Sequence, residues 1–401
     1  MSWAALASNQ AVSYNNLQDA VNNGVFIAKT TIPVSDQEVT KANADTYVYL
    51  NTSYSPYASK ASNQLITKSN LLAKSKLYTT GNSAGTYGLL QSTDGGTNFS
   101  INTNVTGGYY PASVSASLNS ANYIMVGRQG TYARPGDGRL TRNAGSTWSD
   151  LTNISTTNED IQMTAISDSG QYMIASRTSG TVGRQNLYTS NNYGSSFTLT
   201  LNNIGLLWFS NGISMSSDGS RILIAVTVPY NAYRVYSTNY GASWSTSYLG
   251  FSALSNMAVS AMSSNGQYQL VGFARTGYGL SLSTNFGGSF YDVPYASGYT
   301  WSSVSVSSSG KYMLAFSSTG YLYQSSDYGS TWAIVNGGSH FAAGGTVKFA
   351  PNEQAVYLTV ATYLSGTSDH LYISNDYGVT WSIQSIASFY FGYTIAIQNV
   401  T

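Results

Sequence analysis

The chain has 401 residues with no cysteine and two histidines, so it forms neither disulfides nor thiolate metal sites and offers little imidazole chemistry. Charged residues make up 8% of the sequence, against about 25% in ordinary soluble domains. With a net charge of +1, the chain lacks the basic surface of a nucleic-acid-binding protein. No apolar run is long enough to span a bilayer, and near neutrality favours association with other molecules.

Residues 1–70 differ from the rest of the chain in sequence pattern, which predicts a separate module with short helices. One helix is predicted over YNNLQDAVNNG, Tyr14–Gly24, where the final glycine ends it. A second is predicted after Ser35, an N-cap residue with Glu38 three positions later. The module also holds a small duplication, SNQAVSYNNL and SNQLITKSNL.

The N-terminus carries no sign of a Sec signal peptide. No lysine or arginine precedes Lys29, and no apolar core follows the first residues. An extracellular location would then require release by lysis, as for a phage structural protein, or a dedicated export machine. Residence in the cytosol is the alternative.

An eight-residue pattern, Ser/Thr-x-Asp/Asn-x-Gly-x-x-Trp/Phe, dominates the remainder and is called the octapeptide below. Successive copies start 42 to 49 residues apart. A period in the forties that carries strands and turns is typical of a β-propeller. The seven copies begin at Ser92, Thr141, Ser190, Ser237, Ser283, Ser325 and Ser374.

The residue types of the octapeptide suit a tight turn. A short Asp or Asn side chain accepts hydrogen bonds from nearby backbone amides, and glycine supplies a positive φ without steric penalty. The closing aromatic ring begins the next strand, and burying it between neighbouring blades would contribute about 2–3 kcal/mol. These rings are Phe99, Trp148, Phe197, Trp244, Phe290, Trp332 and Trp381.

Strand patterns surround each octapeptide. Ahead of the copy at Ser325 stand VSVSSSG, KYMLAF and YLYQSS, and WAIV follows it, which predicts a four-stranded antiparallel blade. The continuous apolar strand in each blade suits a position covered on both faces. We therefore predict an all-β fold in which residues 71–401 form a seven-bladed propeller. YTIAIQN, Tyr393–Asn399, resembles an innermost strand and is predicted to close the first blade, which removes open edges.

These repeats resemble the Asp-box, or BNR, repeats of sialidases, sortilin-type receptors, xyloglucanases and photosystem assembly factors, over about four fifths of the chain. The resemblance implies a propeller and is weak evidence of activity. Asn replaces Asp in four copies, which indicates that the position serves the turn: Asn143, Asn192, Asn239 and Asn285.

The N-terminal segment resembles attachment regions of tail and fibre proteins from phages of Bacteroidetes-type hosts. That resemblance implies that residues 1–70 bind other virion or assembly proteins. The alternative is a cap that plugs one end of the propeller.

A ligand is expected on the face opposite the octapeptides, where loops after the second and fourth strands of each blade surround the channel. Aromatic rings with neighbouring arginine, serine and asparagine suit a neutral or mildly acidic sugar. The candidate ligand-binding residues are Arg128, Tyr132, Arg134, Arg177, Trp208, Tyr233, Arg275, Tyr299 and Trp301.

Catalysis is the less favoured interpretation. By resemblance, a sialidase needs three arginines from successive blades, yet Arg275 is out of step with the matching Arg128 and Arg177. An ordinary glycosidase needs two carboxylates across the scissile bond, and Asp150 with Asp292 is the candidate pair. No phosphate-binding or dinucleotide motif and no metal-ligand spacing is present, so no cofactor is expected. A structural calcium at the octapeptides stays open.

The sequence thus predicts a non-enzymatic binding or structural component of a multimeric extracellular assembly, such as a phage tail or spike protein that binds host-surface carbohydrate. Neither nucleic acid nor membrane insertion is expected. The alternative is a glycoside hydrolase or sialidase-like enzyme that acts on surface polysaccharide.

Overall fold

The computed structural model describes residues 48–49, 65–66 and 75–398, except for gaps at 84–85, 106–109, 119, 121, 130–137, 152, 155–159, 180–183, 207–211, 229–230, 253–257, 274–278, 295–297, 336–340, 342–343, 361–369 and 385–388. The chain divides into two compact units, residues 1–75 with 401, and residues 76–400. In the first unit, strands β1 (Val48–Tyr49) and β2 (Leu65–Ile66) form an antiparallel pair. The two helices predicted within residues 1–70 lie outside the described residues.

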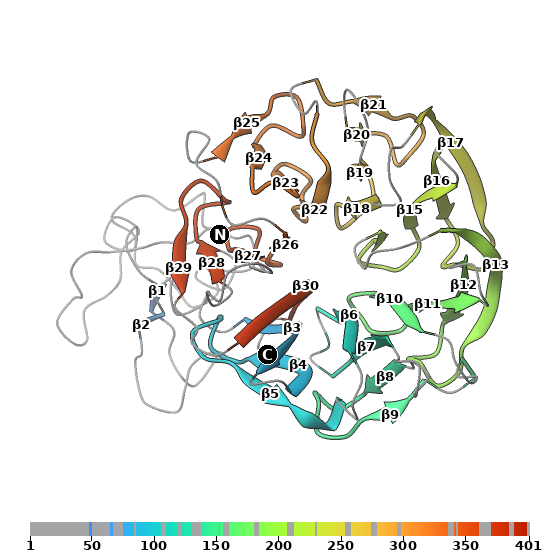
Figure 1. The fold of residues 1–401 in the computed structure, drawn as a ribbon, viewed down its shortest axis with the longest axis vertical. Helices are drawn as coiled ribbons and strands as arrows, with labels where there is room; N and C mark the ends of the chain where they lie inside the picture. The colour runs from blue at the N-terminus through green and yellow to red at the C-terminus, as the bar shows by residue number, and fades with distance from the viewer. Residues whose placement is uncertain are drawn as a thin grey trace, which may run out of the picture. The chain divides into compact units, whose positions relative to one another are not determined.

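The second unit is a seven-bladed β-propeller (Figure 1), as the sequence predicts. Each blade is an antiparallel sheet of four strands, which are named below from the innermost outward. Blade one is β30 (Phe389–Gln398), β3 (Lys76–Ser83), β4 (Thr86–Ser92) and β5 (Ser100–Asn102). Blade two is β6 (Tyr110–Ala116), β7 (Ile124–Gln129), β8 (Gly138–Thr141) and β9 (Ser149–Asp150). Blade three is β10 (Ile161–Ile166), β11 (Met173–Ser179), β12 (Arg184–Ser190) and β13 (Thr198–Leu206).

The remaining four blades follow the same order. Blade four is β14 (Ile213–Met215), β15 (Ile222–Val228), β16 (Asn231–Ser237) and β17 (Ser245–Ser252). Blade five is β18 (Ala258–Met262), β19 (Gln269–Phe273), β20 (Leu280–Ser283) and β21 (Tyr291–Asp292). Blade six is β22 (Trp301–Val306), β23 (Met313–Ser317), β24 (Leu322–Ser325) and β25 (Ala333–Ile334). Blade seven is β26 (Gly345–Phe349), β27 (Val356–Val360), β28 (His370–Ser374) and β29 (Ser382–Gln384).

Two features depart from seven isolated sheets. The long strand β13 pairs with β15 at Leu206 and Thr227, which joins blades three and four into one sheet. A single turn of 3-10 helix, η2 (Thr103–Val105), follows β5. Within the described residues, no helix has the length and apolarity that crossing a membrane takes.

Burial falls from the channel outward because each inner strand is covered on both faces by neighbouring blades. The second strands β19, β23 and β27 are buried at every residue, whereas the outermost β9 and β21 are exposed. The core therefore lies between blades and not at the centre of the ring. In one such cluster, Leu270 and Leu282 of blade five pack with Trp301 and Met313 of blade six.

The two ends of the propeller sequence meet in blade one. Strand β30 pairs with β3 from Lys76 opposite Gln398 to Ser83 opposite Phe389, so the C-terminal strand is innermost and β3, β4 and β5 follow it. This arrangement closes the ring, because β30 covers the edge of β3 that would otherwise be open.

The octapeptide joins the third and fourth strands of every blade, and its side chains close the turn. In all seven copies the Ser or Thr hydroxyl donates to the Asp or Asn Oδ1 at 2.7–2.9 Å. The same hydroxyl accepts the glycine amide at 2.8–3.0 Å. The glycines have φ between 71° and 95°, a range that L side chains rarely adopt. The Oδ1 bonds are the same for Asn and Asp. The second side-chain atom bonds the seventh residue in either case, as an accepting Asp Oδ2 or a donating Asn Nδ2, so the interchange leaves the turn intact.

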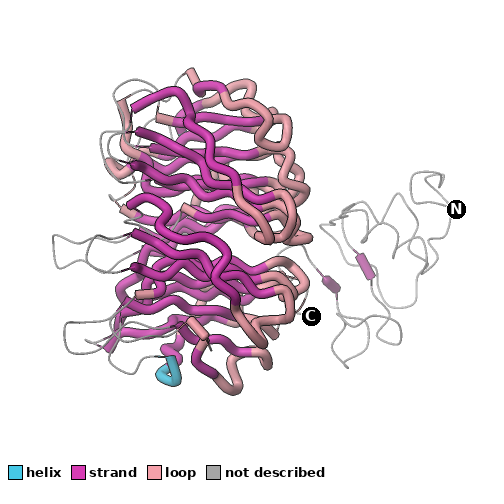
Figure 2. The backbone as a smooth tube through the Cα atoms, turned by 90° about the vertical axis from the view of Figure 1, so that its right-hand side faces the viewer, coloured by secondary structure: helices cyan, strands magenta, loops and turns pink. Residues whose placement is uncertain are grey.

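Because strands alternate in direction, the octapeptide turns lie on the same face as the hairpins between first and second strands. We call this the octapeptide face. Figure 2 shows the strands of the second unit running between its two faces. The Phe197 and Trp332 rings are buried as predicted, and the other described closing aromatics are partly buried.

Candidate functional site

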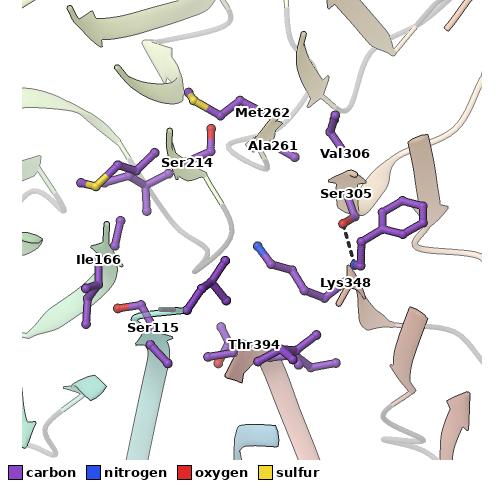
Figure 3. A pocket seen from close by; sticks show the side chains of 18 of the residues that line it. Ser115, Ile166, Ser214, Ala261, Met262, Ser305, Val306, Lys348 and Thr394 are labelled. Carbon is purple, nitrogen blue, oxygen red and sulfur yellow. Dashed lines mark hydrogen bonds between the residues drawn. The ribbon is translucent and has the colours of Figure 1, made fainter. Parts of the chain in front are cut away.

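A cavity of about 220 Å³ follows the axis of the propeller. Its walls come from the innermost strand of every blade, so no single blade can form it (Figure 3). Its surface is largely serine, threonine and aliphatic side chains. Several hydroxyls bridge neighbouring blades: Ser115 Oγ donates to Thr164 Oγ1 at 3.1 Å, and Ser214 and Ser260 share a bond of 3.2 Å. These cross-blade bonds fix the walls of the channel.

Strand registers place seven residues at equivalent positions on the seven innermost strands, and one of them breaks the pattern. Six are small: Ser115, Ala165, Ser214, Ala261, Ser305 and Ala396. The seventh is Lys348 of β26. Its side chain extends from its own strand into the open channel (Figure 3).

Lys348 and Asp168 are the two charged residues among the described side chains that line the cavity. The Lys348 side chain is exposed to the solvent of the channel, although the channel walls partly desolvate it. Burial therefore lowers the pKa of Lys348, while the carboxylate of Asp168 acts in the opposite direction. Burial raises the pKa of Asp168, opposed by a hydrogen bond from Ser217 and by the charge of Lys348. The two groups influence each other through the channel without forming an ion pair.

Asp168 belongs to a run of backbone bonds around the channel on the octapeptide face. The amide of Asp168 donates to the carbonyl of Ser217 at 2.9 Å, and the amide of Ser217 to that of Ser264 at 2.8 Å. Ser264 continues the run to Ser308 at 3.0 Å. Blades three to six are thus linked at this end of the channel by the first turn of each blade.

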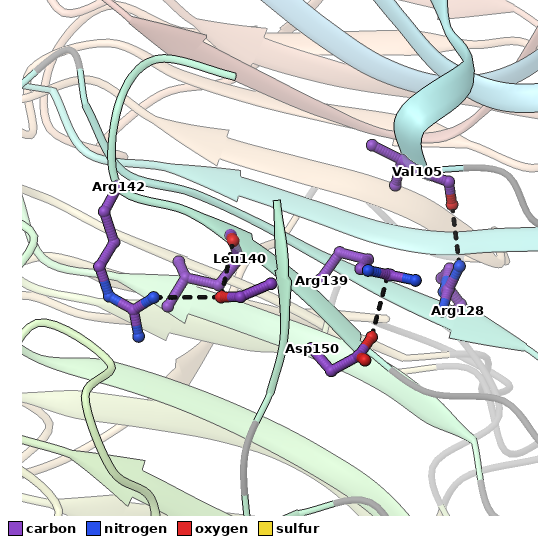
Figure 4. A network of polar contacts seen from close by, with 7 residues as sticks. Val105, Arg128, Arg139, Leu140, Arg142 and Asp150 are labelled. Atoms are coloured by element: carbon purple, nitrogen blue, oxygen red, sulfur yellow. Dashed lines mark hydrogen bonds and ion pairs between the residues drawn. The ribbon is translucent and has the colours of Figure 1, made fainter. Parts of the chain in front are cut away.

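Three predicted ligand-binding residues serve packing instead. Arg128 is 1% exposed, and its Nη1 donates to the carbonyl of Val105 at 3.0 Å (Figure 4). Arg177 repeats this contact one blade later, donating to the carbonyl of Ile154 at 2.9 Å. Trp301 is wholly buried between blades five and six. Arg128 and Trp301 are thus buried and do not form an open ligand surface, because an arginine or tryptophan on a propeller strand also packs between blades, whereas Arg177 is partly exposed.

The other predicted residues divide into two groups. Tyr233 and Tyr299 are partly buried within aromatic contacts, Tyr233 with Tyr248 at 5.3 Å and Tyr299 with Tyr321 at 5.3 Å between ring centroids. Four lie outside the described residues: Tyr132, Arg134, Trp208 and Arg275.

The candidate carboxylate pair is not brought together. Asp150 lies in β9 and forms an ion pair with Arg139 at 3.0 Å (Figure 4). Asp292 lies in β21 and accepts a hydrogen bond from Ser281 at 3.0 Å. Both strands are the outermost of their blades, so the two side chains do not face each other across the channel. Within the part of the chain that the structure describes, no group of three or more His, Asp or Glu side chains could hold a metal ion.

A surface that the sequence analysis missed lies on the octapeptide face. The fourth residue of the octapeptide is aromatic in blades three to seven, and these rings form what we call the aromatic crescent: Tyr193, Tyr240, Phe286, Tyr328 and Tyr377. All five have φ between 60° and 64°, which is unusual for bulky side chains. The first four are 41–44% exposed, and the fifth is partly buried.

Each ring of the crescent packs on the blade before it. In that preceding blade, one second-strand residue pairs with the Ser or Thr of the blade's own octapeptide. The residue immediately before it in the sequence is the one that contacts the ring. Ring centroids of Tyr172 and Tyr240 lie 4.3 Å apart, and those of Tyr312 and Tyr377 lie 4.2 Å apart. Tyr123 and Tyr268 hold Tyr193 and Tyr328 similarly, and the Arg221 guanidinium lies 4.7 Å over Phe286. The repeated aromatic residue before the octapeptide glycine is the signal that could have revealed this surface.

Comparison with known proteins finds similarity of structure alone. No family model matches the chain, and neither does any curated protein. YCF48 bound to D1 peptide is similar at 13% identity with a TM-score of 0.47, covering 80% of this chain and 91% of that one. TolB from Acinetobacter baumannii has 13% identity and a TM-score of 0.47, covering 83% and 85%. A GH74 enzyme of Niastella koreensis has 14% identity and a TM-score of 0.40, covering 87% and 61%. At these values none of them identifies a site or an activity for this chain.

Proposed function

We propose that the propeller is a non-catalytic binding component of an extracellular assembly, a phage tail or spike protein, and that its ligand is host-surface glycan. The aromatic crescent carries this proposal. It presents rings in a row of five blades, and each ring is held by a neighbouring blade. Apolar ring faces beside hydroxyl and amide groups suit the stacking of sugars. The crescent thereby replaces the opposite face as the favoured glycan surface.

The chemistry of the channel favours binding over hydrolysis. A glycosidase of the ordinary kind uses two carboxylates about 5–10 Å apart. Of the described residues that line the cavity, Asp168 alone carries a carboxylate. Asp150 and Asp292 lie on the outermost strands of blades two and five. We therefore favour the binding role over the glycosidase alternative.

The assembly role rests on the chain's composition and its N-terminal module. With 8% charged residues and a net charge of +1, the protein is suited to association with other molecules. In this proposal residues 1–70 attach the propeller to other virion proteins. We also propose that the octapeptides are Asp-box repeats, because their Ser/Thr, Asp/Asn and Gly residues make one shared set of turn hydrogen bonds.

Glycan arrays and host-cell pull-downs with the full chain test the glycan role. The informative variant is Tyr240→Gly with Tyr328→Gly, because the first octapeptide already carries glycine at this position, Gly95 with φ of 74°. Loss of two stacking rings, at about 0.5–1.5 kcal/mol each, predicts roughly 5- to 150-fold weaker binding. Tyr291→Ala is the matched control, since Tyr291 is 46% exposed but lies on the outer strand β21.

Two results would contradict the glycan role. One is the absence of any glycan or host-cell binding by the unaltered chain. The other is equal affinity of the double variant and the Tyr291→Ala control. Sugar release from host polysaccharide would instead support the hydrolase alternative.

A further inference from the structure

We propose that the central channel is an anion-binding site in which Lys348 binds a carboxylate group. The ligand class is a small carboxylate, either free or borne by an acidic sugar. The site lies inside the ring, apart from the aromatic crescent on the octapeptide face, so this inference does not rest on the proposed glycan function.

Lys348 departs from the symmetry of the channel. At the six equivalent positions the propeller uses serine or alanine. Packing therefore requires only a small side chain there. The side chain of Lys348 is exposed to the channel, and partial desolvation by the channel walls lowers its pKa. A lysine at this one position is thus explained by its charge rather than by its volume.

The ammonium group has no partner of its own within the part of the chain that the structure describes. Among the described residues, Lys348 Nζ contacts no hydrogen-bond acceptor and forms no ion pair; Asp168 acts on it at longer range. A lysine ammonium has three donors and no acceptor. An anion in the channel would supply the missing acceptor.

The channel around the ammonium group has room for a ligand. The cavity of about 220 Å³ is far larger than the roughly 10–15 Å³ that holds one water molecule. A carboxylate has two oxygens and needs several donors. The channel thus offers the ammonium donors of Lys348 and space for more than a bare ion.

The test is saturation-transfer NMR and calorimetry on the full chain at constant ionic strength, with acetate, glucuronate and glucose as probes. We expect saturable binding of acetate, glucuronate or both, and none of glucose. Lys348→Met keeps an unbranched side chain, one atom shorter, but removes its charge, and should weaken that binding at least tenfold. Lys311→Met is the matched control, because Lys311 is an exposed lysine on the octapeptide face.

The acetate and glucuronate probes distinguish a free carboxylate from one borne by an acidic sugar. Binding of acetate alone assigns the site to a small free anion, whereas binding of glucuronate assigns it to acidic sugars. Lys348→Ala is a control for misfolding, since alanine already occupies three equivalent positions. This variant should keep the melting temperature of the unaltered chain and lose anion binding. Tyr240→Gly with Tyr328→Gly should retain acetate or glucuronate binding even if glycan binding fails.

Two outcomes would overturn the site. They are the absence of saturable binding of either acid by the unaltered chain, and equal affinities of the Lys348→Met and Lys311→Met variants.

Discussion

Adding one methyl group to an octapeptide glycine tests how tightly the blades pack. Gly329 in blade six has φ of 86°, and a Cβ atom there would overlap the side chain of Leu282 in blade five. Gly145 in blade two has φ of 88°, but the nearest atom to its added Cβ would lie 3.8 Å away. The substitutions Gly329→Ala and Gly145→Ala therefore share their backbone strain and differ in the contact between blades.

The two variants are expected to differ in the free energy of unfolding. Alanine in the left-handed region costs roughly 1–2 kcal/mol in both. Overpacking against Leu282 adds about 1–3 kcal/mol in Gly329→Ala alone. We thus expect losses of about 1–2 kcal/mol for Gly145→Ala and about 2–5 kcal/mol for Gly329→Ala. Equilibrium urea unfolding measures both, with an unchanged slope as the sign that only stability has altered.

A second substitution isolates the contact itself. Leu282→Ala leaves a cavity and is destabilising alone, but in that background the added methyl group meets open space. The effects of Gly329→Ala and Leu282→Ala should therefore be less than additive. Equal losses for the two glycine variants, or strict additivity with Leu282→Ala, would refute this account of blade packing.

Three further predictions concern acid stability, ring closure and the buried arginines. For the octapeptide carboxylates, burial opposes ionisation but turn hydrogen bonds outweigh it, so their pKa values lie below 3.8: Asp94, Asp327 and Asp376. A lowered pKa gives the fold extra stability above the unfolded pKa, and that stability is lost as the pH falls. Changing all three residues to Asn should therefore flatten the fall in melting temperature below about pH 4. Deleting residues 389–401 removes β30 and leaves β3 with an open edge, so the truncated chains should associate with one another. Size-exclusion chromatography measures this, and a monomeric product would contradict it. Arg128→Met should lower the free energy of unfolding by about 1.5–3 kcal/mol in urea titration, while glycan binding stays unchanged; weaker binding at full stability would restore Arg128 as a ligand residue.

The fold could be predicted from the sequence because its information is local and repeated. Each octapeptide closes its turn with its own side chains, so Ser325, Asp327 and Gly329 specify the turn without help from distant residues. The spacing of the copies then leaves room for four strands, and the strand pattern of residues 393–399 matches the place that β30 occupies.

The candidate sites were less predictable because they depend on register across blades. Lys348 stands in an ordinary strand pattern, GTVKF, and its significance appears only when seven innermost strands are aligned through their pairing. Arg128 and Trp301 are chemically suited to bind sugars, but their strands turn them into the packing between blades. A charged or aromatic residue alone does not reveal whether it faces a loop surface or a neighbouring blade.

The crescent and its contacts are matched blade by blade. The fourth octapeptide residue lacks a ring in two blades, where it is Gly95 and Ala144. The supporting position of the preceding blade then holds Ala355 for Gly95 and Lys76 for Ala144, and neither is a tyrosine. Ring and support are thus present together or absent together. The pairing has a physical reason, because a bulky left-handed residue costs about 1–2 kcal/mol and an aromatic pair returns about 0.5–1.5 kcal/mol.

This near balance predicts that the rings contribute little net stability. Tyr240→Gly relieves the backbone as it loses the stack, so its free energy of unfolding should change by less than about 1 kcal/mol. Tyr172→Ala removes the stack but leaves Tyr240 strained, and should be the more destabilising of the two in urea titration. If Tyr240→Gly instead lowers the free energy of unfolding by several kcal/mol, the rings serve to stabilise the fold and give no support for a binding surface. If it is neutral, five strained rings, four of them exposed, remain to be explained by what they contact outside the chain.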